Sequence, residues 1–338
     1  MQKMQENVPI KDLTTMKVGG PARYVQEITS AKQLPAAYQF ARENELPVWV
    51  LGNGANTLAK DEGFGGLVLL SRLKGVSLKV SGNDLLVAAA AGEEMDDVVE
   101  QTAKKGYTGL EGLTGIPGTV GAAPVQNIGA YGQEIKDTLV SIEVYDAKTG
   151  KTKVIPKAAC KFGYRESIFN TGEDAGRYFI LKVHFKLRKG QMKPPFYVSL
   201  STYLELHGIT DYSPMSIRKA VAAVRAEKLP DVKVQPSAGS FFKNVYLSDY
   251  EAAKARAKGI QVWLERGKNI VPSGWLIEQT GLKGQSFYGF KVWDKAALIL
   301  VNEGGGDYVD LAKARREIVS RVEAKFGYTL EQEPMEME

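Results

Sequence analysis

Three short clusters in this sequence carry side chains that could bind or protonate an anionic substrate. Arg165 and Glu166 stand between aromatic residues in FGYRESIF, where a guanidinium can be held rigidly for a two-point contact with a carboxylate. Ser240 follows a flexible Ala-Gly pair in SAGSFFKN, and Glu331 and Glu333 share one side of the extended LEQE. Taken alone, each cluster has a structural alternative that we favour: a surface ion pair, a loop serine and an acidic tail.

The segment 106–132 is the strongest sign of a ligand. It is rich in glycine and small residues, and a loop this long inside a compact domain is uncommon unless it is functional or disordered. Its apolar residues, among them Leu113 and Val120, favour an ordered segment. Backbone N–H groups beside glycine can approach a pyrophosphate closely and form an anion-binding nest. We therefore favour ligand binding here over an ordinary surface loop.

A second glycine-bearing loop, GNGANT at 52–57, follows a short strand predicted at 48–51. The loop has two of the three glycines of the dinucleotide fingerprint, and no acidic residue follows at the usual distance. A plain tight turn is therefore about as probable from this loop alone as a phosphate-binding one.

Histidine and cysteine are too scarce for several kinds of site. His184 falls on the polar face of a predicted strand, where we expect it to be exposed, and His207 falls in a polar loop. Neither has cysteines or acidic residues at ligand spacing, so we expect no metal site. No GxSxG elbow accompanies a Ser-His-Asp triad either. Proton chemistry must then come from Ser, Tyr, Lys, Arg or Glu.

The composition is that of an ordinary globular protein. The chain has 338 residues, enough for two domains, and Lys plus Arg exceeds Asp plus Glu by 44 − 39 = 5. No basic run with interleaved aromatics indicates nucleic acid binding, and no apolar run is long enough to insert in a membrane. Cys160 stands alone, so we expect a buried thiol, no internal disulfide and a cytoplasmic location.

Periodicity and end signals predict mixed helices and strands in an α+β arrangement. Ser30 and Gln33 predict a capping-box helix start, and Tyr178–Arg188 alternates so that Phe179, Leu181, Val183, Phe185 and Leu187 would share one face. Further helices are predicted at 93–105, at 214–228 behind the N-cap Ser213, and at 308–326 before Gly327, with a strand, YTLE, at 328–331. The charged, proline-bearing RKGQMKPP marks a domain boundary.

Taken together, the segments of the chain carry a family resemblance. GLEGLTGIPGTVGAAPVQNIGAYGQEI, CKFGYRESIF, AGSFFKN, GWLIEQTGLKG and ALILVNEGG resemble, in this order, the UDP-N-acetylenolpyruvoylglucosamine reductase (UDP-N-acetylmuramate dehydrogenase) family, over essentially the whole chain. The resemblance implies an α+β chain: an FAD-binding domain of the vanillyl-alcohol oxidase-like (PCMH) type at 14–188, a linker at 189–195, and an α+β substrate-binding domain at 196–333.

The resemblance also implies a reaction and its residues. The reaction is the NADPH-dependent, FAD-mediated reduction of UDP-N-acetylglucosamine enolpyruvate to UDP-N-acetylmuramate in peptidoglycan precursor synthesis. The implied catalytic residues are Arg165, Ser240 and Glu333. Implied substrate-binding residues are Lys228, Asn244 and Tyr203, the last on a loop that closes over substrate in the longer, type I members. The implied cofactor-binding residues are Gly52, Asn53, Gly54, Ala55, Asn56, Ile116, Pro117, Gly118, Thr119, Gly121 and Ala122.

The chain departs from the family pattern in places. Ser237 stands where the family usually has Asn, Val245 where it has Pro, and TMKVGG where many relatives read NTF. Because the sequence ends soon after LEQE, we expect the segment around Glu333 to fray. Neither flavin loop holds a histidine or cysteine, so FAD should be noncovalent, and we expect a monomer.

Two other functions stay open from the sequence. A flavin oxidase or dehydrogenase of the same fold would act on an unrelated substrate. A non-catalytic protein would only bind flavin or a nucleotide sugar. The choice between NADPH and NADH is not fixed by any motif.

Overall fold

The structure is a computed structural model that describes residues 4–337. Packing divides the chain into two units. The first unit contains the segments up to Val8, Ala22–Asn53 and Gly65–Ala226; the second contains Pro9–Pro21, Gly54–Phe64 and the chain from Glu227 onward. Residues 196–226 thus pack with the first unit. The assignment of 14–188 to FAD binding, of 189–195 to a linker and of 196–333 to substrate binding stays a prediction, because packing alone does not say which segments bind which ligand.

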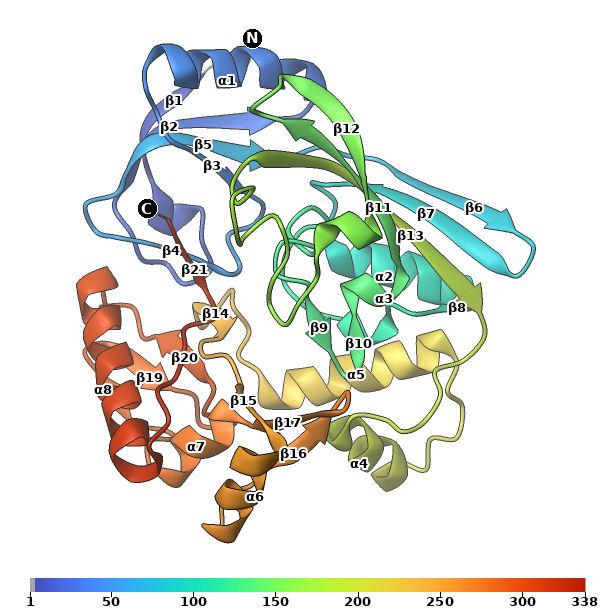
Figure 1. Cartoon of the computed structure of the whole chain (residues 1–338), viewed down its shortest axis with the longest axis vertical. Helices are drawn as coiled ribbons and strands as arrows, with labels where there is room; N and C mark the ends of the chain where they lie inside the picture. Colours follow the sequence, from blue (N-terminus) through green and yellow to red (C-terminus); the bar gives the residue numbers. More distant parts are fainter. Residues whose placement is uncertain (1–3, 338) are drawn as a thin grey trace. The chain divides into compact units, whose positions relative to one another are not determined.

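A small sheet and one helix open the first unit. The capping box at Ser30 and Gln33 is confirmed: the Gln33 side chain accepts the Ser30 N–H at 2.9 Å. Helix α1 (Leu34–Glu43) follows and covers the sheet, as Figure 1 shows, burying Leu34 and Ala41 against Ile28, Leu67 and their neighbours. The sheet order is β1 (Gln5–Pro9), β2 (Pro21–Ile28), β5 (Phe64–Ser71) and β3 (Val48–Leu51).

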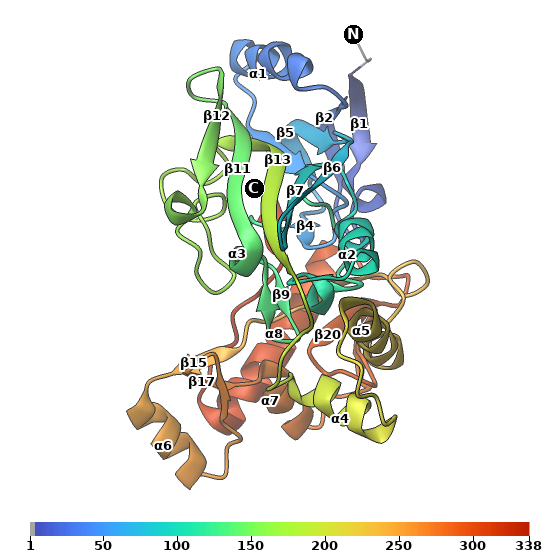
Figure 2. The same ribbon diagram turned by 90° about the vertical axis from the view of Figure 1, so that its right-hand side faces the viewer.

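A larger antiparallel sheet forms the rest of the first unit's framework, and its strands β11 and β13 run roughly vertically in Figure 2. Its order is β12 (Lys151–Pro156), β11 (Leu139–Asp146), β13 (Tyr178–Lys189), β7 (Asp84–Ala90) and β6 (Val76–Ser81), with β8 (Tyr107–Thr108) paired to the end of β13.

The strand predicted at Tyr178–Arg188 is confirmed as β13, but its predicted single apolar face is wrong. The β11 register shifts between Glu143, which faces Lys182, and Val144, which faces Ile180. The extra residue bends the strand. Phe179 and Leu181 therefore pack in the cluster under α1, whereas the next apolar residues pack in the main core: Val183, Phe185 and Leu187.

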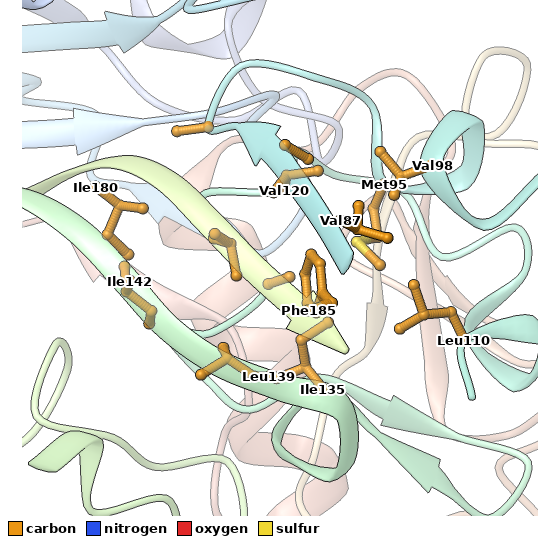
Figure 3. Close-up of a cluster of buried hydrophobic side chains, with 14 of the residues drawn as sticks. Val87, Met95, Val98, Leu110, Val120, Ile135, Leu139, Ile142, Ile180 and Phe185 are labelled. Atoms are coloured by element: carbon orange, nitrogen blue, oxygen red, sulfur yellow. The ribbon is translucent and has the colours of Figure 1, made fainter. Parts of the chain in front are cut away.

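The glycine-rich segment 106–132 is ordered, as predicted. Leu110 and Val120 point into the core beside Met95 and Phe185 (Figure 3), and both are essentially inaccessible to solvent. The segment ends in a small hairpin, with β9 (Gly129–Ala130) inside it and β10 (Gln133–Glu134) directly after it. Besides α1, the α-helices of this unit within the described residues are α2 (Met95–Lys104), α3 (Ile135–Thr138), α4 (Val198–Leu206) and α5 (Pro214–Lys228), the last ending at the start of the second unit.

The three isolated residues singled out in the sequence have defined surroundings. Cys160 is fully buried, as predicted, and burial raises the pKa of its thiol to about 11. His184 is half-buried with Nε2 2.6 Å from Glu143 Oε1, so the expectation that it is exposed is wrong. His207 caps the end of α4, and its ring stacks on Tyr203 with centroids 4.0 Å apart.

The core of the second unit, within the described residues, is built mainly from two antiparallel sheets and three α-helices. One sheet has the order β14 (Ser237–Ser240), β20 (Ile299–Asn302), β19 (Phe290–Val292) and β18 (Ser286–Phe287). The other has the order β15 (Val245–Leu247), β17 (Lys268–Val271) and β16 (Trp263–Glu265). The helices are α6 (Asp249–Ala257), α7 (Ser273–Gln279) and α8 (Tyr308–Phe326), around a core that includes Phe241, Phe242, Phe290 and Ile318.

The end of the chain differs from both expectations. Residues 328–331 are not a strand, although Glu331 O accepts the Lys243 N–H at 2.8 Å and the next residue, Gln332, forms an isolated bridge with Phe242. The segment around Glu333 does not fray either. Strand β21 (Met335–Met337) pairs in parallel with β4 (Thr57–Ala59), visible in Figure 1. Met337 is buried, which holds the end of the described chain in place.

Among residues 4–337, none of the helices combines the length and apolar character that crossing a membrane requires. Within the same residues, no three His, Cys, Asp or Glu side chains gather as a metal site would need.

Candidate active site

Ser240 lies at the end of β14, where the backbone is irregular. Ser237 pairs with Val301 and Ser240 with Ile299, so the two strands are out of step by one residue between these pairs. Gly239 takes up the irregularity with a φ of 73°, a left-handed conformation that glycine adopts without strain. The buried side chains of Phe241 and Phe242 anchor the next two residues. Ser240 is half-buried, and its hydroxyl makes no hydrogen bond within the described residues.

Glu333 lies next to Ser240 in the second unit. Its N–H donates to Phe241 O at 2.9 Å, and Lys243 N–H donates to Glu331 O at 2.8 Å on the other side of the Phe242–Gln332 bridge. In an antiparallel bridge this places Glu333 opposite Phe241, the residue that follows Ser240. The structure thus places the backbones of two of the three predicted catalytic residues on neighbouring segments, and their joint action on a substrate stays a prediction.

Arg165 occupies a tight turn in the first unit. Gly163 N–H donates to Glu166 O at 2.9 Å, which closes the turn, and Arg165 has a φ of 58° at its tip. A left-handed backbone conformation at a residue other than glycine costs roughly 1 kcal/mol or more, and it persists only when the surrounding structure enforces it. The enforcing contact is the hydrogen bond from Asn170 Nδ2 to Arg165 O, at 3.0 Å. The guanidinium lies 5.1 Å from the centre of the Tyr164 ring, a cation–π contact.

The Arg165 turn is tied to the glycine-rich segment. Asn127 Nδ2 donates to Gly163 O at 2.9 Å, and Ser167 Oγ donates to Val125 O at 2.6 Å. These bonds fix the turn on both sides of Arg165. Arg165 is half-buried and Glu166 is exposed; that the guanidinium itself is held rigidly stays a prediction.

The two predicted flavin loops contact each other in the first unit. Val120 N–H donates to Glu93 O at 2.8 Å, so residues 116–122 run beside the segment that leads into α2. A Cβ on Gly52 would lie 2.5 Å from Thr119 Oγ1, closer than real Cβ contacts allow. Asn53 Nδ2 donates to Glu94 Oε1 at 2.6 Å, which fixes the first loop to the same segment.

The residues at this contact fit a flavin pyrophosphate. The hydroxyl of Thr119 is buried and has no hydrogen-bond partner within residues 4–337, which is costly unless a ligand supplies one. Gly118 has a φ of 135°, and a Cβ there would meet no atom of the protein within 4 Å, so the space before its backbone is open. An open glycine beside an unsatisfied donor suits an anionic group.

Thr15 connects the rest of the first loop to the Ser240 strand within the second unit. Thr15 N–H donates to Gly54 O at 3.1 Å, and its hydroxyl donates to Ser237 O at 2.7 Å. Only glycine fits at position 54, because a Cβ would lie 2.2 Å from Leu13 O. The sequence reasoning did not identify Thr15; the departure of TMKVGG from the family pattern drew attention to this stretch but gave no role to any of its residues.

The predicted substrate-binding residues lie in different settings. Lys228 is exposed at the end of α5, where its carbonyl accepts the Trp293 Nε1–H at 2.9 Å. Asn244 Oδ1 accepts the Ser273 N–H, 3.1 Å away, just after the Ser240 strand. Tyr203 lies on helix α4 and not on a loop, half-buried against His207.

Two protein-family models match the chain. One, described as an FAD binding domain, matches residues 22–155, and one, described as the C-terminal domain of UDP-N-acetylenolpyruvoylglucosamine reductase, matches residues 230–337. A UDP-N-acetylenolpyruvoylglucosamine reductase from Ralstonia nicotianae is 39% identical over 343 residues, which cover 99% of both chains. This chain belongs to that reductase family. The family resemblance predicted from the sequence is thus confirmed.

Solved structures agree with the predicted fold. The crystal structure of a UDP-N-acetylenolpyruvylglucosamine reductase from Thermus caldophilus matches with a TM-score of 0.68 at 28% identity, covering 99% of this chain and all of that one. A p-cresol methylhydroxylase with bound substrate matches with a TM-score of 0.52 at 11% identity, covering 96% of this chain and 84% of that one, which shows the fold alone. The predicted α+β chain with a PCMH-type flavin domain is confirmed.

Proposed function

We propose that this chain reduces UDP-N-acetylglucosamine enolpyruvate to UDP-N-acetylmuramate, and that Arg165, Ser240 and Glu333 act on the substrate. Membership of the reductase family supports the reaction and makes the chain an FAD-containing oxidoreductase of peptidoglycan precursor synthesis, with NADPH as hydride donor. The observation that carries the residue roles is the hydrogen bond that sets Glu333 beside Phe241, next to Ser240.

Ser240 is proposed as the proton donor. FAD, held by residues 52–56 and 116–122, would supply hydride transfer from NADPH to the terminal vinyl carbon of the enolpyruvyl ether. Negative charge then spreads from the neighbouring carbon into the carboxylate. That carbon is a strong enough base to take the proton of the Ser240 hydroxyl, although a serine is a weak acid. The half-buried position of Ser240, and the absence of a hydrogen bond to its hydroxyl within residues 4–337, support this role.

Arg165 and Glu333 are proposed to stabilise the charge that develops on the substrate carboxylate. A guanidinium offers two parallel donors to a carboxylate, and a protonated Glu333 offers one more. The rigid turn that holds Arg165 supports its role, because preorganised donors stabilise a developing charge without rearranging.

The other site residues are proposed to bind. Residues 52–56 and 116–122 would hold the pyrophosphate of a noncovalent FAD, as the orphaned Thr119 hydroxyl supports. Lys228 and Asn244 would contact the nucleotide sugar, and Tyr203 would cover it. We propose that residues 14–188 form the domain that binds FAD and that residues 196–333 form the domain that binds the nucleotide sugar. The fully buried Cys160 suits a reducing, cytoplasmic setting, and we propose a monomer.

An anaerobic titration tests the proposed function. NADPH should bleach the flavin absorbance of the purified protein, and UDP-N-acetylglucosamine enolpyruvate should restore it with formation of UDP-N-acetylmuramate. A flavin oxidase of the same fold would be reoxidised by oxygen or by another substrate and not by the UDP sugar. A binding protein would carry FAD that NADPH does not bleach. Either of these results would overturn the proposal.

A further inference from the structure

The segment that carries Glu333 has few backbone anchors. Within residues 4–337, antiparallel pairing beside Ser240 consists of one bridge at Gln332 with its two flanking backbone bonds, and strand β21 has three residues. Between these anchors stands Pro334, which has no N–H to donate. Pairing this short is marginal in water without further contacts. Side chains must therefore contribute to holding Glu333 in place.

Helix α8 supplies those side chains. Arg315 Nη1 lies 2.7 Å from Glu336 Oε1 and also donates to Gln332 Oε1. Tyr308 OH donates to the same Glu336 oxygen at 2.6 Å. Gln332 and Glu336 stand on either side of Glu333 in the sequence. Side chains of helix α8 thus hold the chain by hydrogen bonds both before and after Glu333.

The side chains of Tyr308, Arg315, Gln332 and Glu336 form one hydrogen-bonded network that includes an ion pair. Gln332 Nε2 donates to Pro334 O at 2.9 Å, which folds its side chain along the segment. The side chains of Glu336 and Arg315 are only 20% and 29% exposed. Burial alone raises the pKa of Glu336, but hydrogen bonds from Tyr308 and Arg315 outweigh it and lower the pKa below its usual value. Glu336 therefore stays ionised, and charge-assisted bonds of this kind are the stronger ones.

Helix α8, which carries Tyr308 and Arg315, is firmly anchored in the second unit. Helix α8 buries Leu311, Ala314 and Ile318 in the core of the second unit. At its start, the carboxylate of Asp61 accepts the N–H groups of Tyr308 and Val309, each at 2.9 Å. The side chains of Tyr308 and Arg315 consequently extend from a fixed backbone and can set the position of the segment they hold.

We propose that Arg315, Tyr308 and Glu336 are positioning residues that fix Glu333 beside Ser240. The inference rests on the proposed function, because Glu333 has a catalytic role only there. These three side chains act through the backbone of residues 332–336. Their loss should slow the step that uses Glu333 and leave other steps unchanged.

The test compares the two half-reactions of the full-length, FAD-bound enzyme by stopped-flow absorbance. Arg315→Met should leave bleaching by NADPH unchanged and slow reoxidation by the UDP sugar by about 10–100-fold, as displacements of about 1 Å do in preorganised sites. Arg315→Lys, which keeps the charge, should recover part of the rate. The matched control is Arg321→Met on the same helix: Arg321 is 49% exposed and pairs only with Glu317 among the described residues, at 2.7 Å, so both half-reactions should be normal.

A double-mutant cycle separates positioning from general stability. In a Glu333→Gln background, Arg315→Met should add no further loss of reoxidation rate, because the residue it positions is already disabled. An equal loss in both backgrounds, or a normal rate in Arg315→Met itself, would overturn the inference. If Arg315→Met does not retain FAD, Tyr308→Phe removes a single hydroxyl and is read in the same cycle.

A failure of the proposed function would give a different experimental result from a failure of the positioning role. If the wild-type enzyme, once bleached by NADPH, is not reoxidised by the UDP sugar, the function is wrong. If it is reoxidised but Glu333→Gln is as fast as wild type, the role of Glu333 fails, and the positioning role fails with it.

Discussion

Gly52→Ala should weaken FAD binding by a predictable amount. The new Cβ would lie 2.5 Å from Thr119 Oγ1, whereas ordinary contacts begin at 3.4 Å, so the Thr119 side chain or one of the loops must move by 3.4 − 2.5 = 0.9 Å. The backbone at Gly52 is not left-handed, so the methyl group itself is the cause. A displacement of this size in a preorganised cradle should raise the Kd for FAD about 10–100-fold, or about 1.4–2.8 kcal/mol. Overpacking should also cost about 1–3 kcal/mol of stability.

The assay is fluorescence titration of the apoprotein with FAD, with thermal unfolding measured in parallel. The matched control is Gly65→Ala, where a Cβ meets no atom within 4 Å, so affinity and unfolding temperature should both be normal. In a Thr119→Ala background, which removes the clashing oxygen, Gly52→Ala should cost nothing further. A lowered unfolding temperature with wild-type FAD affinity would show that the clash is real but that these loops do not hold the flavin.

The remaining predictions concern catalysis, acid stability and the thiol. Arg165→Lys should slow reoxidation by the UDP sugar by roughly 10²–10³-fold with normal FAD content, because lysine lacks the planar fork; near-normal turnover would make Arg165 structural. Asp146→Asn should lower the free energy of unfolding in urea at neutral pH by about 1.5–3 kcal/mol, because it breaks charge-assisted bonds between the 2%-exposed carboxylate and both Arg177 and Lys153. The hydrogen bond from Arg177 holds the pKa of Asp146 below its usual value, so its stabilisation is present above the ordinary carboxyl range and is lost as pH falls through the lowered pKa. The difference from wild type should therefore shrink in acid, and a constant difference would contradict the ion pair. Cys160 should resist alkylation at pH 8 until the protein is denatured, because burial raises its pKa to about 11; rapid labelling of the native protein would show that it is accessible.

Local signals in the sequence predict helices well in this protein. Helices α5 and α8 begin and end where their caps indicate: Pro214 opens α5, and Gly327, with a φ of 75°, closes α8. Strand details fail because a distant partner decides them. The bulge in β13 depends on its register with β11, and YTLE, within residues 4–337, makes too little backbone pairing to be a strand, although its alternating pattern suits one.

The site shows the same limit. Ser240, Arg165 and Glu333 stand out because they combine reactive side chains with unusual local sequence. Thr15 and Arg315 do not, because their partners are far along the chain: Ser237 is 222 residues from Thr15, and Glu336 is 21 residues from Arg315. Residues that position a site through tertiary contacts leave no pattern of their own in one sequence.

The proton-donor role of Ser240 can be isolated because the reaction has two halves. Bleaching of the flavin by NADPH delivers no proton to substrate carbon, so it does not need this hydroxyl. Only reoxidation by the UDP-enolpyruvyl sugar requires a proton at the carbon that carries the negative charge. The two steps therefore make different demands on the same residue.

Stopped-flow absorbance on Ser240→Ala is the most direct test of this account. Bleaching by NADPH should stay close to the wild-type rate, while reoxidation by the UDP sugar should fall by several orders of magnitude, each tenfold being about 1.4 kcal/mol of barrier. Equal slowing of both halves would mean that Ser240 positions the flavin or supports the fold of its loop. Reoxidation at the wild-type rate would mean that the proton comes from another group, and would contradict the central claim.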